Sequence, residues 1–405
     1  MMTNLLFQPL ELPNGTVLKN RFVKPAMSEV MGDAQFRPTE ALNHLYQRWA
    51  AGGSGLLITG NVMVDATALG EKGNVVIEDD RDLPRLRNWA AAGSRNGAQT
   101  WVQLNHPGRQ SPKHLSAQPV APSAVPLTGD NAFAFNPPRA LTVAEIHAIV
   151  QRFATAAAVV QAAGFGGVEI HAAHGYLLSQ FLSPLANVRT DQYGGALANR
   201  MRVIEEVYHA IRAKVGPAFP IGLKINSADF RDGGFSEADS LQVIHRMADL
   251  GVDLIEVSGG NYENTMVQGS NRGGAFFIDY AAKAKRGLTT PILLTGGFRS
   301  LDGMTRAVAN GETDLVGLAR ASALIPDLPH RAAIGQFDAI DLTRLSTGIR
   351  ALDRRVGSYI GLSYYEMQMA RLAQGKAVRV TRNAWIPLGY ALRTQGPSFL
   401  TPRRA

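Results

Sequence analysis

Short apolar runs alternate with longer stretches of helical periodicity in this sequence, and the alternation repeats eight times between residues 21 and 319. The runs, which predict strands, are residues 21–27, 55–64, 100–105, 167–172, 221–227, 253–258, 291–296 and 314–319. Helices are predicted between them, among others over residues 39–51, 83–94, 142–163 and 236–250, several with a polar cap and a closing Gly. Eight such pairs are typical of a (β/α)₈ TIM barrel, which takes about 250 residues plus insertions. The sequence therefore predicts this fold for residues 1–340.

A doubly wound parallel sheet is the alternative with the same alternation of elements. Its dinucleotide-binding loop would connect a strand to a helix. The nearest glycine-rich candidate, GFGGVE at residues 164–169, precedes a strand instead, which favours the barrel.

Two segments extend the predicted barrel. The proline-rich residues 107–141 follow the third strand and far exceed the about 2 to 6 residues usual for such a loop, so they are predicted to form a lid. Residues 341–405 are predicted to form a basic helical extension packed on the barrel or on a partner subunit. Its expected buried anchors are Tyr364, Tyr365, Met369 and Leu372, the last three spaced as on one helix face.

The net charge of +8 lies in this extension, because residues 341–405 hold 11 Lys/Arg and 3 Asp/Glu. These basic residues are scattered and form no stripe with stacking aromatics, which argues against nucleic-acid binding. No run approaches the about 20 apolar residues that span a bilayer, and residues 1–10 lack the features of a signal peptide. A cytoplasmic location without membrane binding is therefore expected.

Cysteine is absent from the sequence. This absence excludes disulfides, thiolate nucleophiles, thiolate zinc sites and cysteine-held iron–sulfur clusters. Any redox chemistry must therefore use a bound cofactor.

The segment HAAHGYLLSQFLSP places His171, His174 and Tyr176 directly after the fourth predicted strand. Catalytic residues of TIM barrels collect at the carboxyl ends of strands. The two imidazoles are open to three interpretations. They are packed structural histidines, ligands of a catalytic metal that needs a third protein ligand, or N–H donors to a carbonyl or phenolate oxygen with Tyr176 as a proton source.

The same segment, extended to HAAHGYLLSQFLSPLANVRTDQYGG and the following Asn199-Arg200, closely resembles the central signature of the Old Yellow Enzyme family of FMN-dependent ene-reductases. Further stretches are similar to the family's other strand ends, in the family's order: LKNRFVKPAMS at 18–28, VQLNHPGRQ at 102–110, LLTGGF at 293–298 and Ala319-Arg320. The stretch YYEMQMARLAQGK in the extension is similar to a helix of the longer bacterial members.

The resemblance implies a role for each matching residue. His171 and His174 would hold the activating oxygen of the substrate, and Tyr176 would protonate its α-carbon. Gln103 would bond the pyrimidine end of FMN. Lys224 stands where the family most often has Arg beside flavin N1 and O2; the alternative is a solvated lysine at a strand edge.

The resemblance also implies the other cofactor-binding positions. Pro25, Ala26 and Met27 would pass along the isoalloxazine, with Ser28 near flavin O4. Gly60, where Ala is frequent, is expected to leave room beneath the ring. The remaining positions, mostly near the phosphate, are Gly259, Gly297, Ala319 and Arg320.

The function that the resemblance implies is an ene-reductase with noncovalent FMN and NADH or NADPH as hydride donor. Its substrates would be activated alkenes, namely enones, enals, maleimides and nitroalkenes. Because cysteine is absent, multidomain relatives with iron–sulfur clusters do not fit. A metal-dependent barrel hydrolase using His171 and His174, and a flavin-binding protein without turnover, are the alternatives. A homodimer is one arrangement compatible with the extension; the natural substrate and the choice of nicotinamide are not predicted.

Overall fold

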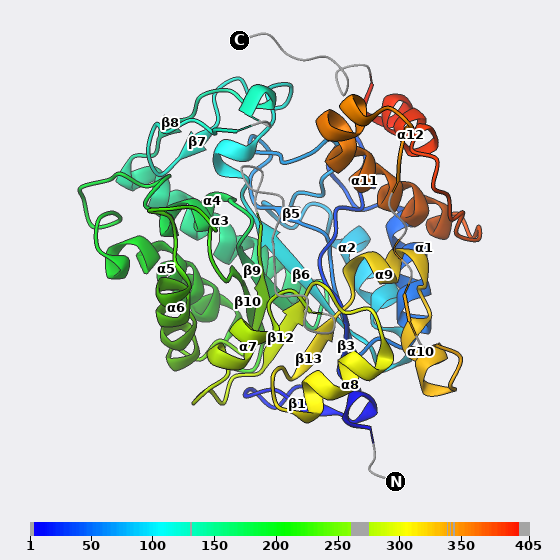
Figure 1. Cartoon of the computed structure of the whole chain (residues 1–405). Helices are drawn as coiled ribbons and strands as arrows, with labels where there is room; N and C mark the ends of the chain where they lie inside the picture. The colour runs from blue at the N-terminus through cyan, green and yellow to red at the C-terminus, as the bar shows by residue number, and fades with distance from the viewer. Residues whose placement is uncertain are drawn as a thin grey trace.

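The barrel is closed by eight parallel strand positions, as expected from the sequence (Figure 1). The computed structural model describes residues 4–129, 132–260, 275–337, 339, 340, 342 and 345–396. Strand β13 pairs with β3 and β4 pairs with β6, which closes the sheet; β5 (Val62–Met63) adds a short pairing to β6. In barrel order the strands are β3 (Phe22–Lys24), β4 (Leu56–Ile58), β6 (Gln99–Asn105), β9 (Gly167–Ala172), β10 (Ile221–Asn226), β11 (Leu254–Ser258), β12 (Ile292–Thr295) and β13 (Leu315–Gly317).

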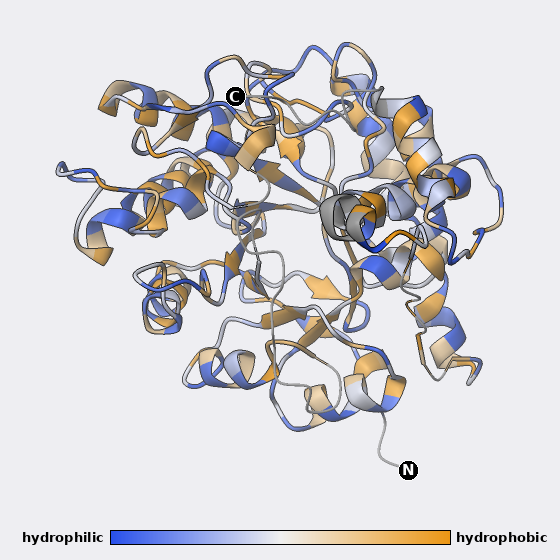
Figure 2. Cartoon of the chain, turned by 45° about the horizontal axis from the view of Figure 1, so that its top comes forward, coloured by the Kyte–Doolittle hydropathy of each residue, from blue (hydrophilic) through white to orange (hydrophobic). Residues whose placement is uncertain are grey.

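Helices surround the barrel and pack their apolar faces on it, while the strands are mainly hydrophobic (Figure 2). The predicted start of one helix is confirmed in detail, because the Thr142 side chain and Glu145 form a reciprocal capping box at its first turn. The surrounding helices are α1 (Glu40–Ala51), α2 (Leu83–Gly93), α3 (Val143–Ala162), α5 (Leu197–Val215), α6 (Glu237–Asp249), α7 (Ile278–Ala284), α8 (Leu301–Ala309), α9 (Ala319–Leu324) and α10 (Leu328–Ala333).

Helix α3 is the one helix in the described ranges that is long and apolar enough to cross a membrane by length and composition alone. Half of its apolar window is buried, and it packs against α5 on the outside of the barrel. These contacts are those of a helix in the layer that surrounds the barrel.

The amino-terminal ends of the strands are closed by a hairpin that the sequence did not predict. Strands β1 (Leu10–Glu11) and β2 (Val17–Leu18) bring Leu12 and Leu18 into a buried apolar cluster with inward-facing strand residues. Trp101 is a fully buried member of this cluster, and a Cβ at Gly167 would lie 2.7 Å from its ring. The barrel interior at the amino-terminal ends of the strands is therefore filled by apolar side chains.

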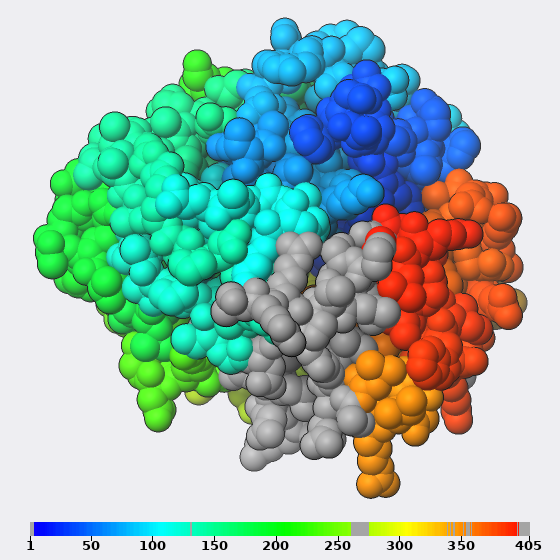
Figure 3. Space-filling model, turned by 90° about the horizontal axis from the view of Figure 1, so that it is seen from above, coloured from blue at the N-terminus to red at the C-terminus, as the bar shows by residue number. Residues whose placement is uncertain are grey.

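Two later segments lie over the opposite face, at the carboxyl ends of the strands (Figure 3). The insertion after β6 contains η3 (Gly108–Gln110), β7 (Val120–Ala121), η4 (Ala132–Ala134) and β8 (Arg139–Ala140). Helix α11 (Arg350–Ala373) contacts α1 and α9 and is followed by α12 (Trp385–Gln395). Met369 and Leu372 of α11 are buried in the main hydrophobic cluster of the barrel. The boundary at residue 340 and a lid function for residues 107–141 remain predictions.

Candidate functional site

His171 lies near the carboxyl end of β9 and is 3% exposed. Its Nδ1 accepts a hydrogen bond from the backbone N–H of Ala173 at 3.2 Å. Burial, followed by the neighbouring His174 and Lys224, holds the pKa of His171 well below its usual range, so the ring is neutral at physiological pH. Because Nδ1 accepts, the neutral ring carries its proton on Nε2. His171 therefore presents one N–H donor whose direction is set by its own loop.

His174 lies in the turn between β9 and α4 (Leu177–Leu182), with a backbone φ of +60°. Such a conformation is uncommon outside glycine and is often found at functional sites. The turn is held from two strands, because the His174 N–H donates to Asn226 Oδ1 at 3.2 Å and Nε2 lies 2.9 Å from Ser258 Oγ. Burial and then the charge of Lys224 lower the pKa of His174 to about 3. This ring is therefore also neutral.

The structure brings the three motif residues together. The ring centroid of His171 lies 5.1 Å from that of His174 and 5.0 Å from that of Tyr176, and both ring pairs are nearly perpendicular. Tyr176 is the N-cap residue of α4 and is 8% exposed. A phenol with a pKa near 10 keeps its proton at neutral pH. Two neutral imidazoles and one weak acid thus share one end of the barrel.

A polar layer lies one step deeper, because inward-facing residues alternate along each strand. Gln103 Nε2 donates to Glu169 Oε2 at 2.6 Å, and Lys224 Nζ donates to Glu256 Oε1 at 2.7 Å. All four residues are at most 2% exposed. The interpretation of Lys224 as a solvated lysine at a strand edge is therefore wrong. Lys224 is a buried cation two residues below the mouth of the barrel.

The carboxyl ends of β12 and β13 form a site suited to an anion. Gly296 and Gly297 follow β12 with φ values of +115° and +96°, which only glycine adopts readily. Arg320 follows β13, and the pKa of nearby Arg299 is lowered by burial and then by the charge of Arg320. Within the described residues, neither guanidinium has a carboxylate partner. Two such cations beside a glycine backbone fit a phosphate dianion.

Ser28 lies beside the carboxyl group of Glu71, which the sequence did not suggest as a site residue. Its Oγ donates to Glu71 and lies 3.4 Å from Asn61 Oδ1. Burial raises the pKa of Glu71, although its bonds to Ser28 and Asn61 oppose the shift. The neighbouring Pro25 is buried, and Ala26 and Met27 are partly buried where the chain leaves β3.

Gly60 does not leave the space expected from the sequence, and that expectation is wrong. A Cβ at this position would lie 2.0 Å from Glu29 Oε2 and 2.4 Å from the Met27 carbonyl oxygen. Glu29 fills the space because it accepts the Gly60 N–H at 3.0 Å and pairs with Lys24 Nζ at 3.2 Å. Gly259 has a similar packing constraint, since a Cβ there would lie 2.5 Å from the Phe277 ring.

The variant Gly60→Ala is expected to lower the free energy of unfolding by about 1 to 3 kcal/mol, the usual cost of overpacking a core. The added methyl group must displace the Glu29 carboxylate from its hydrogen bond to residue 60. Chemical denaturation of the apoprotein measures this change. The control is Gly389→Ala on α12, because Gly389 has no atom within 4 Å of an added Cβ and lies in a helix, where Ala is favoured over Gly. Equal stability of Gly60→Ala and the wild type would contradict the conclusion that Glu29 fills the space beside Gly60.

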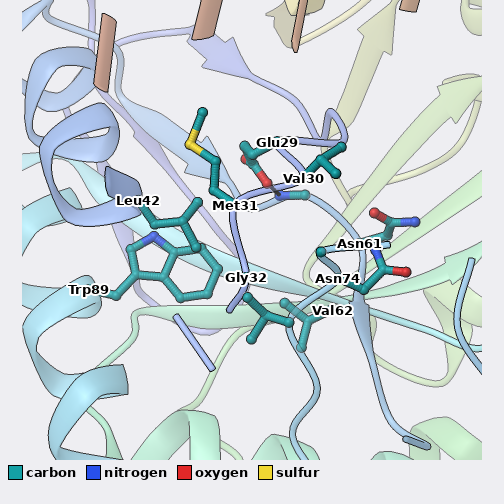
Figure 4. A pocket seen from close by; sticks show the side chains of 12 residues that line it. Glu29, Val30, Met31, Gly32, Leu42, Asn61, Val62, Asn74 and Trp89 are labelled. Atoms are coloured by element: carbon teal, nitrogen blue, oxygen red, sulfur yellow. Dashed lines mark hydrogen bonds between the residues drawn. The ribbon is translucent and has the colours of Figure 1, made fainter. Parts of the chain in front are cut away.

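A small pocket, with room for about one water molecule, lies beside Gly60, between the loops after β3 and β4 and helices α1 and α2 (Figure 4). Glu29, Asn61 and Trp89 are among its lining residues, whereas His171 and Lys224 are not. It is far too small for an organic ligand, since ligand pockets usually measure about 300 to 1,000 Å³. It is therefore distinct from the site formed by the histidines and the polar layer.

Residues 5–338 match the model of the NADH:flavin oxidoreductase / NADH oxidase family. The chain belongs to this family. The NADH-dependent flavin oxidoreductase iliE of Neonectria sp. is 40% identical over 353 residues, covering 80% of this chain and 46% of that protein, so the chain spans about half the length of this relative. The iliE protein of Hypocrea jecorina is 39% identical over 352 residues, covering 79% of this chain and 87% of that protein.

Solved structures support the same assignment. The old yellow enzyme homologue from Zymomonas mobilis has a TM-score of 0.72 at 25% identity, over 82% of this chain and 92% of that one. Morphinone reductase has a TM-score of 0.71 at 25% identity, over 84% and 92%. The chain is accordingly an NAD(P)H-dependent flavin oxidoreductase, and FMN is the cofactor of its family.

The metal-dependent hydrolase finds no support. In the described part of this flavin oxidoreductase, no three or more His, Cys, Asp or Glu side chains are grouped to hold a metal ion. His171 and His174 instead face Ala173, Asn226 and Ser258.

Sequence reasoning missed several residues around the site of this flavin oxidoreductase. They are Glu29, Glu71, Glu169, Asn226, Glu256 and Ser258. Strand alternation offered a signal for part of this set, because Glu169 is two residues from His171 and Glu256 is two from Ser258. Glu29 and Glu71 lie in loops and carried no such signal.

Proposed function

We propose that this flavin oxidoreductase is an ene-reductase that takes hydride from NADH or NADPH and reduces activated alkenes, namely enones, enals, maleimides and nitroalkenes. FMN bound at the barrel mouth supplies the hydride-transfer chemistry between the nicotinamide and the alkene. The grouping of two neutral imidazoles and one phenol at the strand ends carries this proposal. Such a group suits a substrate that has a hydrogen-bond acceptor next to a carbon that needs a proton.

His171 and His174 bind the activating oxygen of the substrate through N–H groups. Negative charge develops on this oxygen as hydride reaches the β-carbon, so fixed donors stabilise the transition state more than the ground state. The lowered pKa values of both rings keep them neutral, and the donor proton of His171 is on Nε2. In this proposal the Ser258 hydroxyl donates to Nε2 of His174, which leaves the donor proton of His174 on Nδ1. Because Asn226 and Ser258 anchor His174, little reorganisation of the ring is needed.

Tyr176 delivers the proton to the α-carbon. Its ring contacts His171, so the acid and the oxygen-binding donor are adjacent. A positioned general acid must be protonated at the working pH, and a phenol meets this condition.

The remaining matched residues bind FMN. Arg320 and the backbone at Gly297, with Arg299 close by, bind the phosphate, since these cations lack a carboxylate partner among the described residues. Gln103 and Lys224 bind the pyrimidine end from the polar layer. The positions that line the ring or its approach are Pro25, Ala26, Met27, Ser28, Gly60 and Gly259, and Ala319 lies in the phosphate region.

Identification of the cofactor tests this proposal first. The purified protein is expected to be yellow and to release FMN on heating, as measured by chromatography of the supernatant. FAD alone, or a stoichiometric metal without flavin, would contradict the proposal. Bleaching of the flavin by NADH or NADPH without air separates an enzyme from a flavin-binding protein without turnover.

Lys224→Ala is expected to weaken FMN binding by about 10- to 100-fold, the equivalent of one charged hydrogen bond. The same change is expected to make the reduction potential of the flavin more negative, because the negatively charged reduced flavin loses its nearest cation. Titration of apoprotein with FMN and spectroelectrochemistry measure the two effects. Lys283→Ala is the control, since Lys283 is half exposed on α7 and lies 3.6 Å from Glu237. If Lys224→Ala binds FMN as the control does, Lys224 has no part in flavin binding.

A cytoplasmic location and a homodimer also remain predictions. Fractionation of cells and light scattering of the holoprotein test them. The fungal and bacterial relatives differ in the nicotinamide that their names give, NADH or NADPH. Rates of flavin reduction with each donor will therefore decide the preference of this chain.

A further inference from the structure

Two carboxyl groups face one another inside the polar layer of the barrel. Glu169 comes from β9 and Glu256 from β11, and both are at most 1% exposed. The strand between them, β10, contributes Lys224, whose Nζ lies 2.7 Å from Glu256 Oε1. Glu169 Oε2 accepts from Gln103 Nε2 at 2.6 Å. Nothing in the proposed hydride transfer uses either acid.

The hydrogen bonds of this pair are incomplete unless it holds a proton. Glu256 Oε2 is buried and accepts no hydrogen bond from any described residue. A buried acceptor without a donor is costly. Glu169 lies within hydrogen-bonding reach of Glu256, and its pKa is raised well above the usual range by burial and then by the charge of Glu256. A proton on Glu169 supplies the missing donor, because two ionised carboxylates cannot bond to one another.

The charges around the pair are few. Lys224 of β10 is the nearest cation, and Lys24 of β3 lies close enough to interact with Glu256. Lys24 is itself paired with Glu29 at 3.2 Å. On the outer sides, β6 contributes the neutral Gln103, and β12 places Leu293 opposite Glu256. One shared proton and one lysine therefore leave the pair and Lys224 without net charge.

Lys224 links this pair to the flavin, and here the inference depends on its proposed place beside the pyrimidine ring. Reduction by hydride adds negative charge to that ring, which attracts Lys224 away from Glu256. A buried carboxylate that loses its cation gains proton affinity, since the ionised form loses its stabilising charge and desolvation favours the neutral form.

We propose that Glu169 and Glu256 form a proton-binding site coupled to the oxidation state of the flavin, holding one proton when the flavin is oxidised and two when it is reduced. The hydride from the nicotinamide brings two electrons and one proton. The second proton comes from solvent and binds the carboxylate that Lys224 leaves. When the alkene takes the hydride, Lys224 returns to Glu256 and the second proton goes back to solvent.

The pH dependence of the midpoint potential tests this inference in the holoprotein. For a two-electron couple, each proton taken up changes the potential by about 30 mV per pH unit. Hydride alone accounts for one proton, so the proposal predicts a slope of about 60 mV per pH unit near neutrality. A slope of about 30 mV per pH unit in the wild type would overturn it.

Infrared difference spectroscopy identifies where the second proton binds. The reduced-minus-oxidised spectrum of the wild type is expected to gain a protonated-carboxyl band that shifts in D₂O. The double variant Glu169→Gln/Glu256→Gln must lose this band. Asp253→Asn is the matched control, because Asp253 directly precedes β11, bonds the Ile221 N–H and Arg212 at the other end of the barrel, and should leave the band unchanged.

The wild-type measurements stand even if the double variant does not fold. Absence of the band in the wild type, or its persistence in the folded double variant, would overturn the inference. Failure of the inference is distinct from failure of the proposed function. A protein that binds no FMN refutes the function, whereas an FMN protein with a one-proton slope refutes only the coupled carboxyl pair.

Discussion

Tyr176→Phe is expected to slow the reduction of cyclohexenone by about 10² to 10⁴, the usual contribution of a positioned acid. The phenylalanine ring preserves the packing against His171 and removes only the proton donor. Reduction of the flavin by NADH or NADPH needs no such proton, so its rate should remain close to that of the wild type. Anaerobic stopped-flow absorbance measures the two half-reactions separately.

Nitroalkenes provide an internal comparison for the same variant. Hydride transfer to a nitroalkene forms a stabilised nitronate, so loss of the acid should affect these substrates least. Tyr208→Phe is the matched control, because the Tyr208 hydroxyl bonds the Leu250 carbonyl oxygen at 2.7 Å on the outside of the barrel. Equal losses in both half-reactions, or no loss with cyclohexenone, would show that Tyr176 is not the acid.

His171→Ala and His174→Ala are each expected to lower the rate of enone reduction by about 10² to 10³, as removal of one oxyanion donor does. The double variant should also lose the long-wavelength charge-transfer band that phenols give with oxidised flavin, because phenolate binding needs the same donors. Titration with a phenol followed by absorbance measures this loss. His147→Ala on the exposed side of α3 is the control.

The outcome for the histidines also bears on their alternative role as packed structural residues. If the double variant folds, keeps FMN and binds phenols as the wild type does, the two rings only support the turn that Asn226 and Ser258 anchor. Substrate binding by the wild type should not weaken between pH 8 and pH 5 through histidine protonation, because the pKa of His174 is lowered to about 3.

The barrel could be predicted because its signal is local. Each strand is a short apolar run, and residues 167–172, for example, form β9 with the predicted bounds. The helix at residues 142–163 carries its start signal in Thr142 and Glu145, and α3 begins at the next position, Val143. Since parallel strands of a barrel end at one face, the grouping of strand-end residues followed from the fold.

The errors concern positions where distant side chains meet. Gly60 was expected to leave space, but Glu29 from the loop after β3 occupies it. Lys224 was open to a solvated interpretation because its partner, Glu256, lies on another strand. Ser28 and Glu71 are 43 residues apart in the sequence and form a hydrogen bond. No local pattern encodes such pairs, because they depend on how loops and inward-facing positions pack.

The most direct test of the ene-reductase assignment follows one sample of holoprotein through both half-reactions without air. The purified protein is expected to show flavin absorbance, and NADH or NADPH should bleach it. Cyclohexenone or a maleimide should then restore the oxidised spectrum while one equivalent of saturated product forms. A bleached flavin that oxygen reoxidises but no activated alkene does would contradict the assignment.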